Sequence, residues 1–266
     1  MAVDLLDKLD KESNQEQNKD LKVDKSPALE AIIQCFEKHV DKYYVEIKDY
    51  FSRRVYNLFK KTNYTYSDVL AFCIELKNLE IKYNQDDNTI NHSAGEFLNH
   101  LIKYIPEKEI NINLSHLDTK LEWICSGDLR GKKISIIGDV DNLGFSMANG
   151  FVYLNGDVYD CGNDMVSGEI RVNGNINKLA NCMNGGKIVV NGNVNYMNRI
   201  CSGEVEIFGD VKNGISLDKG TIKLHGNYQL YYTHYETFSK NLNFYHKNKL
   251  LIKEGKIVKG AKIKWL

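Results

Sequence analysis

The residues of this sequence best placed to do chemistry form a column of carboxyl and amide side chains. Each follows a glycine that recurs at a nearly constant spacing, and together they make up what we call the polar ladder: Asp139, Asp157, Asn175, Asn193, Asp210 and Asn227. Paired carboxylates carry out general acid–base chemistry in glycosidases, so Asp139 and Asp157 would be the pair that cleaves a polysaccharide. Aspartate and asparagine also close glycine-containing turns through local hydrogen bonds. Because a catalytic pair should be a local exception and the ladder recurs in every repeat, we predict a structural role.

Thiols and imidazoles give no sign of a metal centre. The cysteines occur without any CxxC pair, which is typical of packed thiols in a reducing compartment; they are Cys35, Cys73, Cys125, Cys161, Cys182 and Cys201. The last three fall at different distances from the recurring glycine, so they should not converge on one ion. No paired spacing relates the histidines, which include His92, His100, His116 and His225. We therefore expect no metal site, no cofactor and no catalytic residue.

The C-terminal part of the chain combines aromatic and basic side chains. The aromatic ones are Tyr228, Tyr231, Tyr232, Tyr235, Phe238, Phe244 and Tyr245, followed by Lys247, Lys249, Lys253, Lys256, Lys259, Lys262 and Lys264. Such groups bind single-stranded nucleic acid by stacking on bases and contacting phosphates. However, apolar residues alternate with lysines around Glu254-Gly255, which predicts a hairpin whose lysines face water and protect a sheet edge. We expect residues 228–266 to form a C-terminal cap, and nucleic-acid binding is the weaker alternative.

The element that positions all these side chains is a repeat. The first column of glycines, the coil glycines, comprises Gly138, Gly156, Gly174, Gly192, Gly209 and Gly226, and the second, the corner glycines, comprises Gly150, Gly168, Gly186, Gly203 and Gly220. A period of about twenty residues is the signature of a solenoid. A glycine repeated at a corner predicts either a positive φ or a bend too tight for a side chain.

Apolar residues occupy further columns of the same repeat. Two of them alternate with polar residues: Val152, Ile170, Ile188, Val205 and Ile222, then Leu154, Val172, Val190, Ile207 and Leu224. Two others hold Val140, Val158, Ile176, Val194 and Val211, and Met147, Met165, Met183, Ile200 and Leu217. An earlier, degenerate coil has Leu129, Ile134 and Ile136 at matching positions. Alternation at period two predicts a short strand in each coil, and stacked coils then form a parallel β-helix with an apolar interior.

The repeat resembles a known family. Its pattern of Gly-Asp/Asn-Val/Ile, then Gly, then Met, then Gly-x-Ile-x-Val-x-Gly-Asn is similar to the GXGXG β-helix domain, which the large subunit of glutamate synthase shares with one subunit of formylmethanofuran dehydrogenase. The likeness covers residues 138–227. It implies a right-handed parallel β-helix that packs as a scaffold against catalytic modules.

The chain also departs from that family. The inner glycine of the repeat, Gly144 and Gly162, becomes Ala180 and then Asn198, and the last two coils are shorter than the others. Ala2 stands where glutamate synthase exposes a catalytic cysteine, and 266 residues leave no room for a flavin barrel. The resemblance therefore implies structural glycines and apolar columns, and no catalytic residue.

The first part of the chain has a different composition. Residues 1–25 are polar and charged, which predicts a flexible tail. In residues 26–106, Ser26-Pro27 opens an amphipathic helix to about Lys61, a second helix runs over 67–83, and the capping box of Ser93 opens a third. We expect this helical module to cap the first coil of a β-helix over residues 107–227; a partner-binding or dimerising surface is the alternative.

Composition limits the function. Lysine plus arginine and aspartate plus glutamate number 35 each, so no overall field attracts nucleic acid. No stretch approaches about eighteen apolar residues, so we expect a cytoplasmic protein without a membrane span. We predict a non-catalytic scaffold that presents a rigid surface to partner proteins, with a homo-oligomer as a further option. The alternatives are a structural subunit of an oxidoreductase complex like those of the resemblance, and binding of nucleic acid or polysaccharide.

Overall fold

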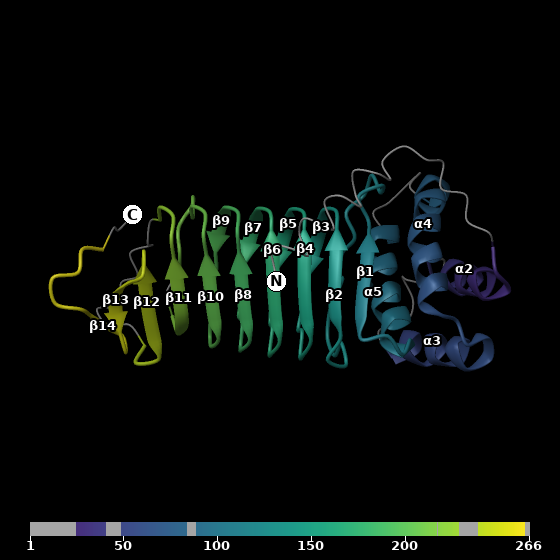
Figure 1. The fold of residues 1–266 in the computed structure, drawn as a ribbon, viewed down its shortest axis with the longest axis horizontal. Helices are drawn as coiled ribbons and strands as arrows, with labels where there is room; N and C mark the ends of the chain where they lie inside the picture. The colour runs from purple at the N-terminus through teal and green to yellow at the C-terminus, as the bar shows by residue number, and fades with distance from the viewer. Residues whose placement is uncertain (1–24, 41–48, 84–88, 217, 229–238, 264–266) are drawn as a thin grey trace.

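The fold joins a group of helices to a long stack of strands (Figure 1). We describe it from a computed structural model, which covers residues 25–40, 49–83, 89–216, 218–228 and 239–263. The predicted class, a helical module followed by a parallel β-helix, is confirmed. All but the last residue of the predicted flexible tail, and also Leu217, Tyr231, Tyr232, Tyr235, Phe238 and Lys264, lie outside the described residues.

The helical module contains four described helices, α2 (Pro27–Val40), α3 (Asp49–Thr62), α4 (Tyr66–Tyr83) and α5 (Thr89–Tyr104). The Ser26 hydroxyl accepts a hydrogen bond from the backbone N–H of Leu29 at 3.0 Å and caps α2, as predicted. The prediction of one helix from Pro27 to Lys61 was wrong, because α2 and α3 are separate and pack against each other. Apolar residues continue at helical spacings between them without glycine or proline, so the sequence carried no signal for the end of α2.

The predicted capping box was also wrong. The last helix begins at Thr89, so Ser93 lies inside it, and its side chain is fully buried. A serine inside a helix cannot cap its N-terminus. The packing of α5 on its neighbours outweighs the preference of serine for a helix start. The helix ends at Tyr104, just before Pro106, as expected.

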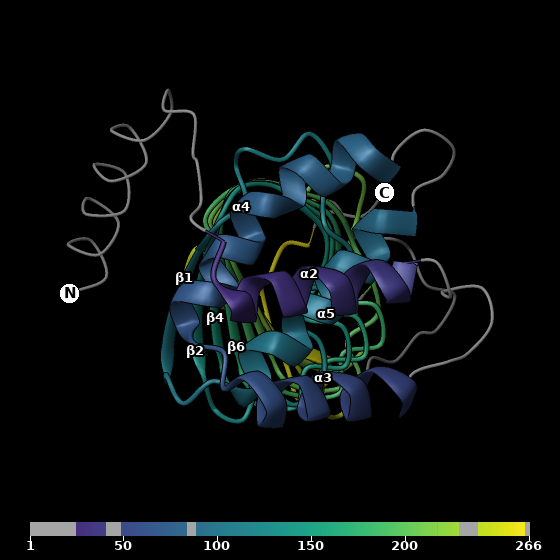
Figure 2. The same cartoon turned by 90° about the vertical axis from the view of Figure 1, so that its right-hand side faces the viewer.

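The helices close one end of the solenoid (Figure 2). Phe36, Phe72 and Phe97 form the centre of their core, with ring centroids 5.3–5.4 Å apart. Contact with the first coil is direct: the Tyr66 hydroxyl lies 2.7 Å from both the backbone nitrogen and the backbone oxygen of Asn111. The buried ammonium of Lys132 donates to the carbonyl of Ile105 at 2.7 Å, which ties the chain after α5 to the second coil.

The strands are β1 (Glu109–Asn113), β2 (Lys133–Ile137), β3 (Val140–Leu143), β4 (Phe151–Asn155), β5 (Val158–Cys161), β6 (Glu169–Asn173), β7 (Ile176–Leu179), β8 (Lys187–Val190), β9 (Val194–Met197), β10 (Glu204–Ile207), β11 (Gly220–Leu224), β12 (Leu242–His246), β13 (Lys249–Lys253) and β14 (Lys256–Ile257). The larger, 10-stranded sheet has the order β1-β2-β4-β6-β8-β10-β11-β12-β13-β14 and is parallel as far as β12. The smaller, 4-stranded sheet has the order β3-β5-β7-β9. Successive coils contribute to both sheets in turn, which is the architecture of a solenoid.

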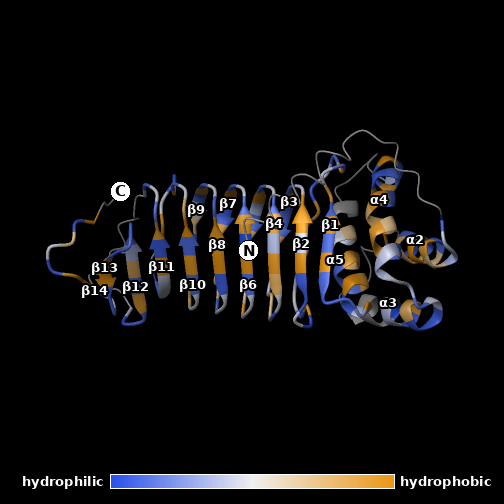
Figure 3. Ribbon diagram, viewed as in Figure 1, coloured by the Kyte–Doolittle hydropathy of each residue, from blue (hydrophilic) through white to orange (hydrophobic). Residues whose placement is uncertain are grey.

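The predicted apolar columns stack in register. Val152 pairs with Ile170, Ile170 with Ile188, and Ile188 with Val205, and all are fully buried. The same holds for Val172 and Val190 in the adjacent column. Hydropathy along the large sheet alternates accordingly between polar and apolar residues (Figure 3). Each coil buries its apolar residues against the coils before and after it, so the core is continuous along the stack.

Close approach of backbones requires glycine in both columns, and the corner column adds a positive φ at each position. A β-carbon on the coil glycine Gly174 would overlap the carbonyl oxygen of Gly156 in the preceding coil, so this column is fixed by close approach of backbones. The corner glycine Gly168 has a φ of +91°, which side chains rarely tolerate, and a β-carbon there would also lie only 2.8 Å from the carbonyl oxygen of Gly150. Both alternatives that the sequence left open therefore occur, and the corner column combines them.

The parallel stack extends beyond the repeat at both ends. Glu109 of β1 pairs with Lys133, and Gly220 of β11 pairs with Leu242. Both pairs are separated by a longer stretch of chain than successive coil glycines are, so periodicity missed both of the added strands. The predicted hairpin at Glu254-Gly255 is present, with φ values of 50° and 73°. A second tight turn, at Lys247-Asn248 between β12 and β13, was not predicted.

Ala180 replaces the inner glycine of the repeat without disturbing the coil. A β-carbon on Gly144 would collide with Cδ1 of Ile170, and one on Gly162 with Cδ1 of Ile188. Ala180 keeps the left-handed backbone, with φ 58°, and carries a real β-carbon. In the next coil, the residue that stacks on Ile188 is Val205, which has no δ-methyl group. The missing methyl makes room for the alanine.

This fit predicts a coupled pair of substitutions. Val205→Ile is expected to destabilise the protein by about 1–3 kcal/mol, because the restored δ-methyl overpacks against Ala180. Adding Ala180→Gly should recover most of that loss. A double-mutant cycle of chemical unfolding measures the coupling, and equal effects of Ala180→Gly in both backgrounds would show that the two residues do not share this space.

Candidate functional site: the outer surface of the solenoid

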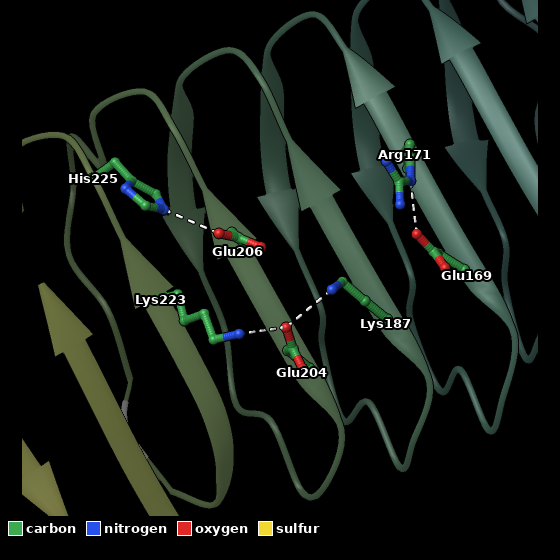
Figure 4. A network of polar contacts seen from close by, with 7 residues as sticks. All are labelled: Glu169, Arg171, Lys187, Glu204, Glu206, Lys223 and His225. Atoms are coloured by element: carbon green, nitrogen blue, oxygen red, sulfur yellow. Dashed lines mark hydrogen bonds and ion pairs between the residues drawn. The ribbon is translucent and has the colours of Figure 1, made fainter. Parts of the chain in front are cut away.

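The outer face of the large sheet carries rows of charged side chains. These residues alternate with the buried columns, and seven of them form a network of polar contacts: Glu169, Arg171, Lys187, Glu204, Glu206, Lys223 and His225 (Figure 4). They come from the adjacent strands β6, β8, β10 and β11, except His225, which directly follows β11. We call this surface the outer face.

Ion pairs connect neighbouring coils across the outer face. Glu204 accepts from Lys187 at 3.1 Å and from Lys223 at 2.9 Å, so it links three strands (Figure 4). Partial burial would raise the pKa of Glu204, but the hydrogen bonds from Lys223 and Lys187 outweigh it and hold that pKa below its usual value. Glu204 therefore stays charged at neutral pH.

Two aromatic rings lie among the charged side chains of the outer face. The ring of His225 stacks on Phe208 with centroids 4.4 Å apart and also lies 3.0 Å from Glu206 through Nε2. Phe208 is 46% exposed although it stands on a regular coil. A flat face that combines ion pairs with an exposed aromatic ring is able to contact another protein, because aromatic groups are enriched where proteins meet.

The polar ladder hydrogen-bonds between coils. Asp139 Oδ1 accepts from the backbone N–H of Asp157 at 2.8 Å, and Asp157 Oδ1 accepts from that of Asn175 at 2.7 Å. The same bond recurs up to Asn227, whose N–H donates to Asp210 at 2.6 Å. The expectation of local turn bonds was wrong, because the stacked register places each side chain closer to the next coil than to its own turn. The ladder side chains therefore hold successive coils together.

A groove with a volume of about 440 Å³ lies along the smaller sheet next to the ladder. Asp157 and Tyr159 line it, whereas Asp139 does not; that residue instead pairs with Lys120 at 3.1 Å. Asparagine side chains on the groove bond to one another, for example Asn195 Nδ2 to Asn177 Oδ1 at 2.7 Å. Of the pair suggested for polysaccharide cleavage, Asp157 therefore lines the groove, and Asp139 lies beside it, paired with the lining residue Lys120.

Two aspartates on this side have pKa shifts of opposite direction. Burial raises the pKa of Asp160, one of whose oxygens, Oδ1, is buried and has no hydrogen-bond partner among the residues that the structure describes. For Asp139, partial burial acts the same way, but the hydrogen bonds from the Asp157 N–H and from Lys120 outweigh it and lower the pKa. The two carboxyls should therefore contribute to stability with opposite signs.

Neutralising these residues tests that difference. Asp160→Asn is expected to stabilise the protein at pH 7, and the gain should vanish below about pH 4, where the carboxyl is protonated in both folded and unfolded chains. Asp139→Asn should destabilise at pH 7, and this loss should disappear as the pH falls through the lowered folded pKa. Unfolding free energies measured from pH 3 to 8 check both; identical pH profiles for the two variants would contradict the assignment.

The cysteines and histidines occupy several parts of the fold. All six cysteines are free thiols, and Cys73, Cys125 and Cys161 are buried. Burial raises the pKa of Cys73 to about 12, which makes it unreactive. His116 contacts the carbonyl of Cys73 at 3.0 Å, and the side chain of His92 lies outside the described residues. Within the described part of the chain, no group of three His, Cys, Asp or Glu residues is placed to hold a metal ion.

The C-terminal lysines face water, as expected. Those in the described residues are exposed: Lys247, Lys249, Lys253, Lys256, Lys259 and Lys262. Of the predicted covering aromatics, Tyr228 and Phe244 are buried, with ring centroids 5.2 Å apart. Phe244 lies in β12, a further parallel strand, so the aromatic residues extend the core as well as cover it.

Sequence reasoning missed one site. A pocket of about 270 Å³, which we call the junction pocket, lies between α5 and the first coils. Trp123 and Phe145 line it together with Lys103, Asp128 and other polar residues. They belong to three separate segments, so no motif or spacing announced them. Their only signal was the presence of two aromatic residues at coil positions outside the apolar columns.

Comparisons of the chain with models of protein families, with curated proteins and with solved structures find no match. Among the described helices, none has the length and apolar character needed to cross a membrane.

Proposed function

We propose that this protein is a rigid, non-catalytic scaffold that presents the outer face to partner proteins. The observation that carries the proposal is the linkage of successive coils by ion pairs, with Glu204 holding both Lys187 and Lys223. Side chains fixed in this way lose little conformational entropy when a partner binds, which favours association. Phe208, exposed beside these charges, provides an apolar contact.

The packed interior supports the same function. The apolar columns fill the solenoid, and the polar ladder holds each coil on the one before it. Such a body keeps the spacing of its surface groups constant. A subunit that fixes the distance between other proteins needs this property, whereas an enzyme usually needs a site with groups free to act on a substrate.

The partner class is a second part of the proposal. Residues 138–227 resemble the GXGXG domain, whose two relatives work within redox and amidotransferase complexes. The register of the strands, with Val158 on Ile176 and Ile176 on Val194, is what that resemblance implies for the fold. A structural subunit of an oxidoreductase complex is therefore the alternative to a free-standing scaffold.

Purification of the tagged full chain from its native cell at low salt tests the proposal. Proteins recovered in stoichiometric amounts would be identified by mass spectrometry, and flavin or iron–sulfur absorbance in the eluate would indicate a redox complex. A colourless protein without partners would contradict the scaffold function and the oxidoreductase association alike.

A pair of charge-reversal variants locates the surface. Arg171→Glu combined with Lys187→Glu changes the outer face, whereas Lys212→Glu changes a lysine beside the groove of the smaller sheet. We expect the first variant to lose the partner and the second to retain it. Equal retention by both would exclude the outer face as the contact surface.

A further inference from the structure

The junction pocket is the cavity where a helix of the N-terminal module faces the solenoid. Its volume is about 270 Å³, and α5 and the loops around Trp123 and Phe145 line it. Ligand sites occur preferentially between modules, in cavities that combine apolar walls with a few polar groups. The size suits a single small ring.

One wall of the pocket is an aromatic pair. The rings of Trp123 and Phe145 stack with centroids 4.8 Å apart and an angle of 29° between their planes. Trp123 has a left-handed backbone, with φ 58°, which is rare for a bulky residue. Its counterparts in the next coils, Asn142 and Asp160, do not share this conformation. Trp123 is thus a local exception to the repeat, and such exceptions concentrate at functional sites.

The protein holds Trp123 in this conformation through α5. Asn99 Nδ2 donates to the Trp123 carbonyl at 2.6 Å and to the Ser126 hydroxyl at 2.8 Å, while its Oδ1 accepts from the Cys125 N–H at 2.7 Å. Gly95 allows the close approach, because a β-carbon there would overlap the carbonyl oxygen of Glu122. The pocket wall is therefore built before any ligand arrives.

Hydrogen-bond donors and acceptors surround the aromatic wall. In the part of the chain that the structure describes, no hydrogen bond or ion pair occupies the Lys103 ammonium or the Ser146 hydroxyl. Asp128 uses Oδ1 to accept from the Arg130 N–H at 2.8 Å, which leaves Oδ2 as an acceptor. Burial lowers the pKa of His100 to about 4, so its imidazole is neutral at neutral pH and can both donate and accept.

These charges select the ligand class. Two carboxylates, Glu96 and Asp128, oppose an anion, and Lys103 opposes a cation. A purely apolar ligand would give no hydrogen bond to the Lys103 ammonium or to Asp128 Oδ2. A nucleobase is read by planar amides that bond to its edge, and Asn99, the one amide among the described residues that line the pocket, is already used within the protein.

We propose that the junction pocket binds one ring of a neutral sugar. The apolar C–H face of the ring packs against the part of the Trp123–Phe145 pair that lines the pocket, and its hydroxyls, which donate and accept, bond to Lys103, Asp128 and Ser146. This site is separate from the outer face and from Asp139 and Asp157, so it stands independently of the scaffold function.

Tryptophan fluorescence tests the proposal directly. The chain has two tryptophans, so Trp265→Phe leaves Trp123 as the sole reporter in the full-length protein. D-glucose, D-galactose, D-mannose and N-acetyl-D-glucosamine are titrated in turn. We expect at least one to change the emission saturably, with a Kd on the order of 1 mM, as the few atoms of a monosaccharide allow.

Matched variants separate this pocket from other surfaces. Lys103→Met and Phe145→Leu should each weaken binding at least about tenfold, while Lys212→Met, beside the groove of the smaller sheet, should leave it unchanged. Circular dichroism confirms that each variant is folded, and Lys103→Met tests the site even if Phe145→Leu does not fold. The proposal is overturned if no sugar gives a saturable change, if Lys103→Met binds normally, or if adenosine or choline binds and the sugars do not.

Discussion

Val172→Asp is expected to abolish the folded solenoid at room temperature. Val172 is 1% exposed and stacks between Leu154 and Val190 inside the parallel coils. A carboxylate there has neither water nor a partner, and its burial costs several kcal/mol, comparable with the total stability of about 5–15 kcal/mol typical of a domain. Circular dichroism and chemical unfolding should show loss of β structure or a stability lower by more than about 4 kcal/mol.

The matched control is Val166→Asp. Val166 is 54% exposed, so the same substitution leaves the new carboxylate in water and should change stability by less than about 0.5 kcal/mol. If Val172→Asp and Val166→Asp melted alike, the assignment of Val172 to the interior would be wrong.

Gly174→Ala should destabilise the protein about as strongly as Val172→Asp, for a different reason. The new methyl group overlaps the carbonyl oxygen of Gly156. The oxygen is part of the backbone and the methyl carbon is bonded directly to the backbone of its own coil, so neither can rotate away. The coils must separate locally, which weakens the bond between the Asn175 N–H and Asp157 Oδ1. We expect a loss of at least about 3 kcal/mol in unfolding free energy, since overpacking against backbone leaves no side chain to move.

Gly131→Ala controls for the conformational cost of alanine. Gly131 has a φ of +67° but open space around its α-carbon, so only backbone strain of about 1 kcal/mol opposes the substitution. Gly174→Ala must be clearly more harmful than Gly131→Ala in parallel urea titrations. A smaller effect would show that the coils tolerate a wider separation than the stacked backbones indicate.

The solenoid was predictable because one requirement repeats in every coil. Val158, Ile176 and Val194 must all face the same interior. The same apolar requirement therefore recurs in every coil, and a pattern that recurs in register is easily told from a chance match. The same logic failed where a coil has an unusual length. The chain between Gly220 and Leu242 is longer than one repeat, so β12 could not be aligned with the repeat although its residues stack in the same columns.

The helices and sites depended on contacts that a single sequence does not display. The helices α2 and α3 pack on each other, and Ser93 is buried inside α5, and neither contact can be read from the sequence. The ladder residues were found, but the partner of each side chain lies one coil away. The junction pocket brings Lys103, Trp123 and Phe145 together only because α5 closes the end of the stack.

The polar ladder has a direction, and this direction matches the order in which the chain is synthesised. Every ladder bond runs from the N–H of a later coil to the side chain of the coil before it, from Asp157 onto Asp139 up to Asn227 onto Asp210. A ribosome delivers a coil of this length in about 1–4 s, N-terminal coils first. During synthesis, each emerging coil thus finds its ladder acceptors on the part of the chain that was made before it.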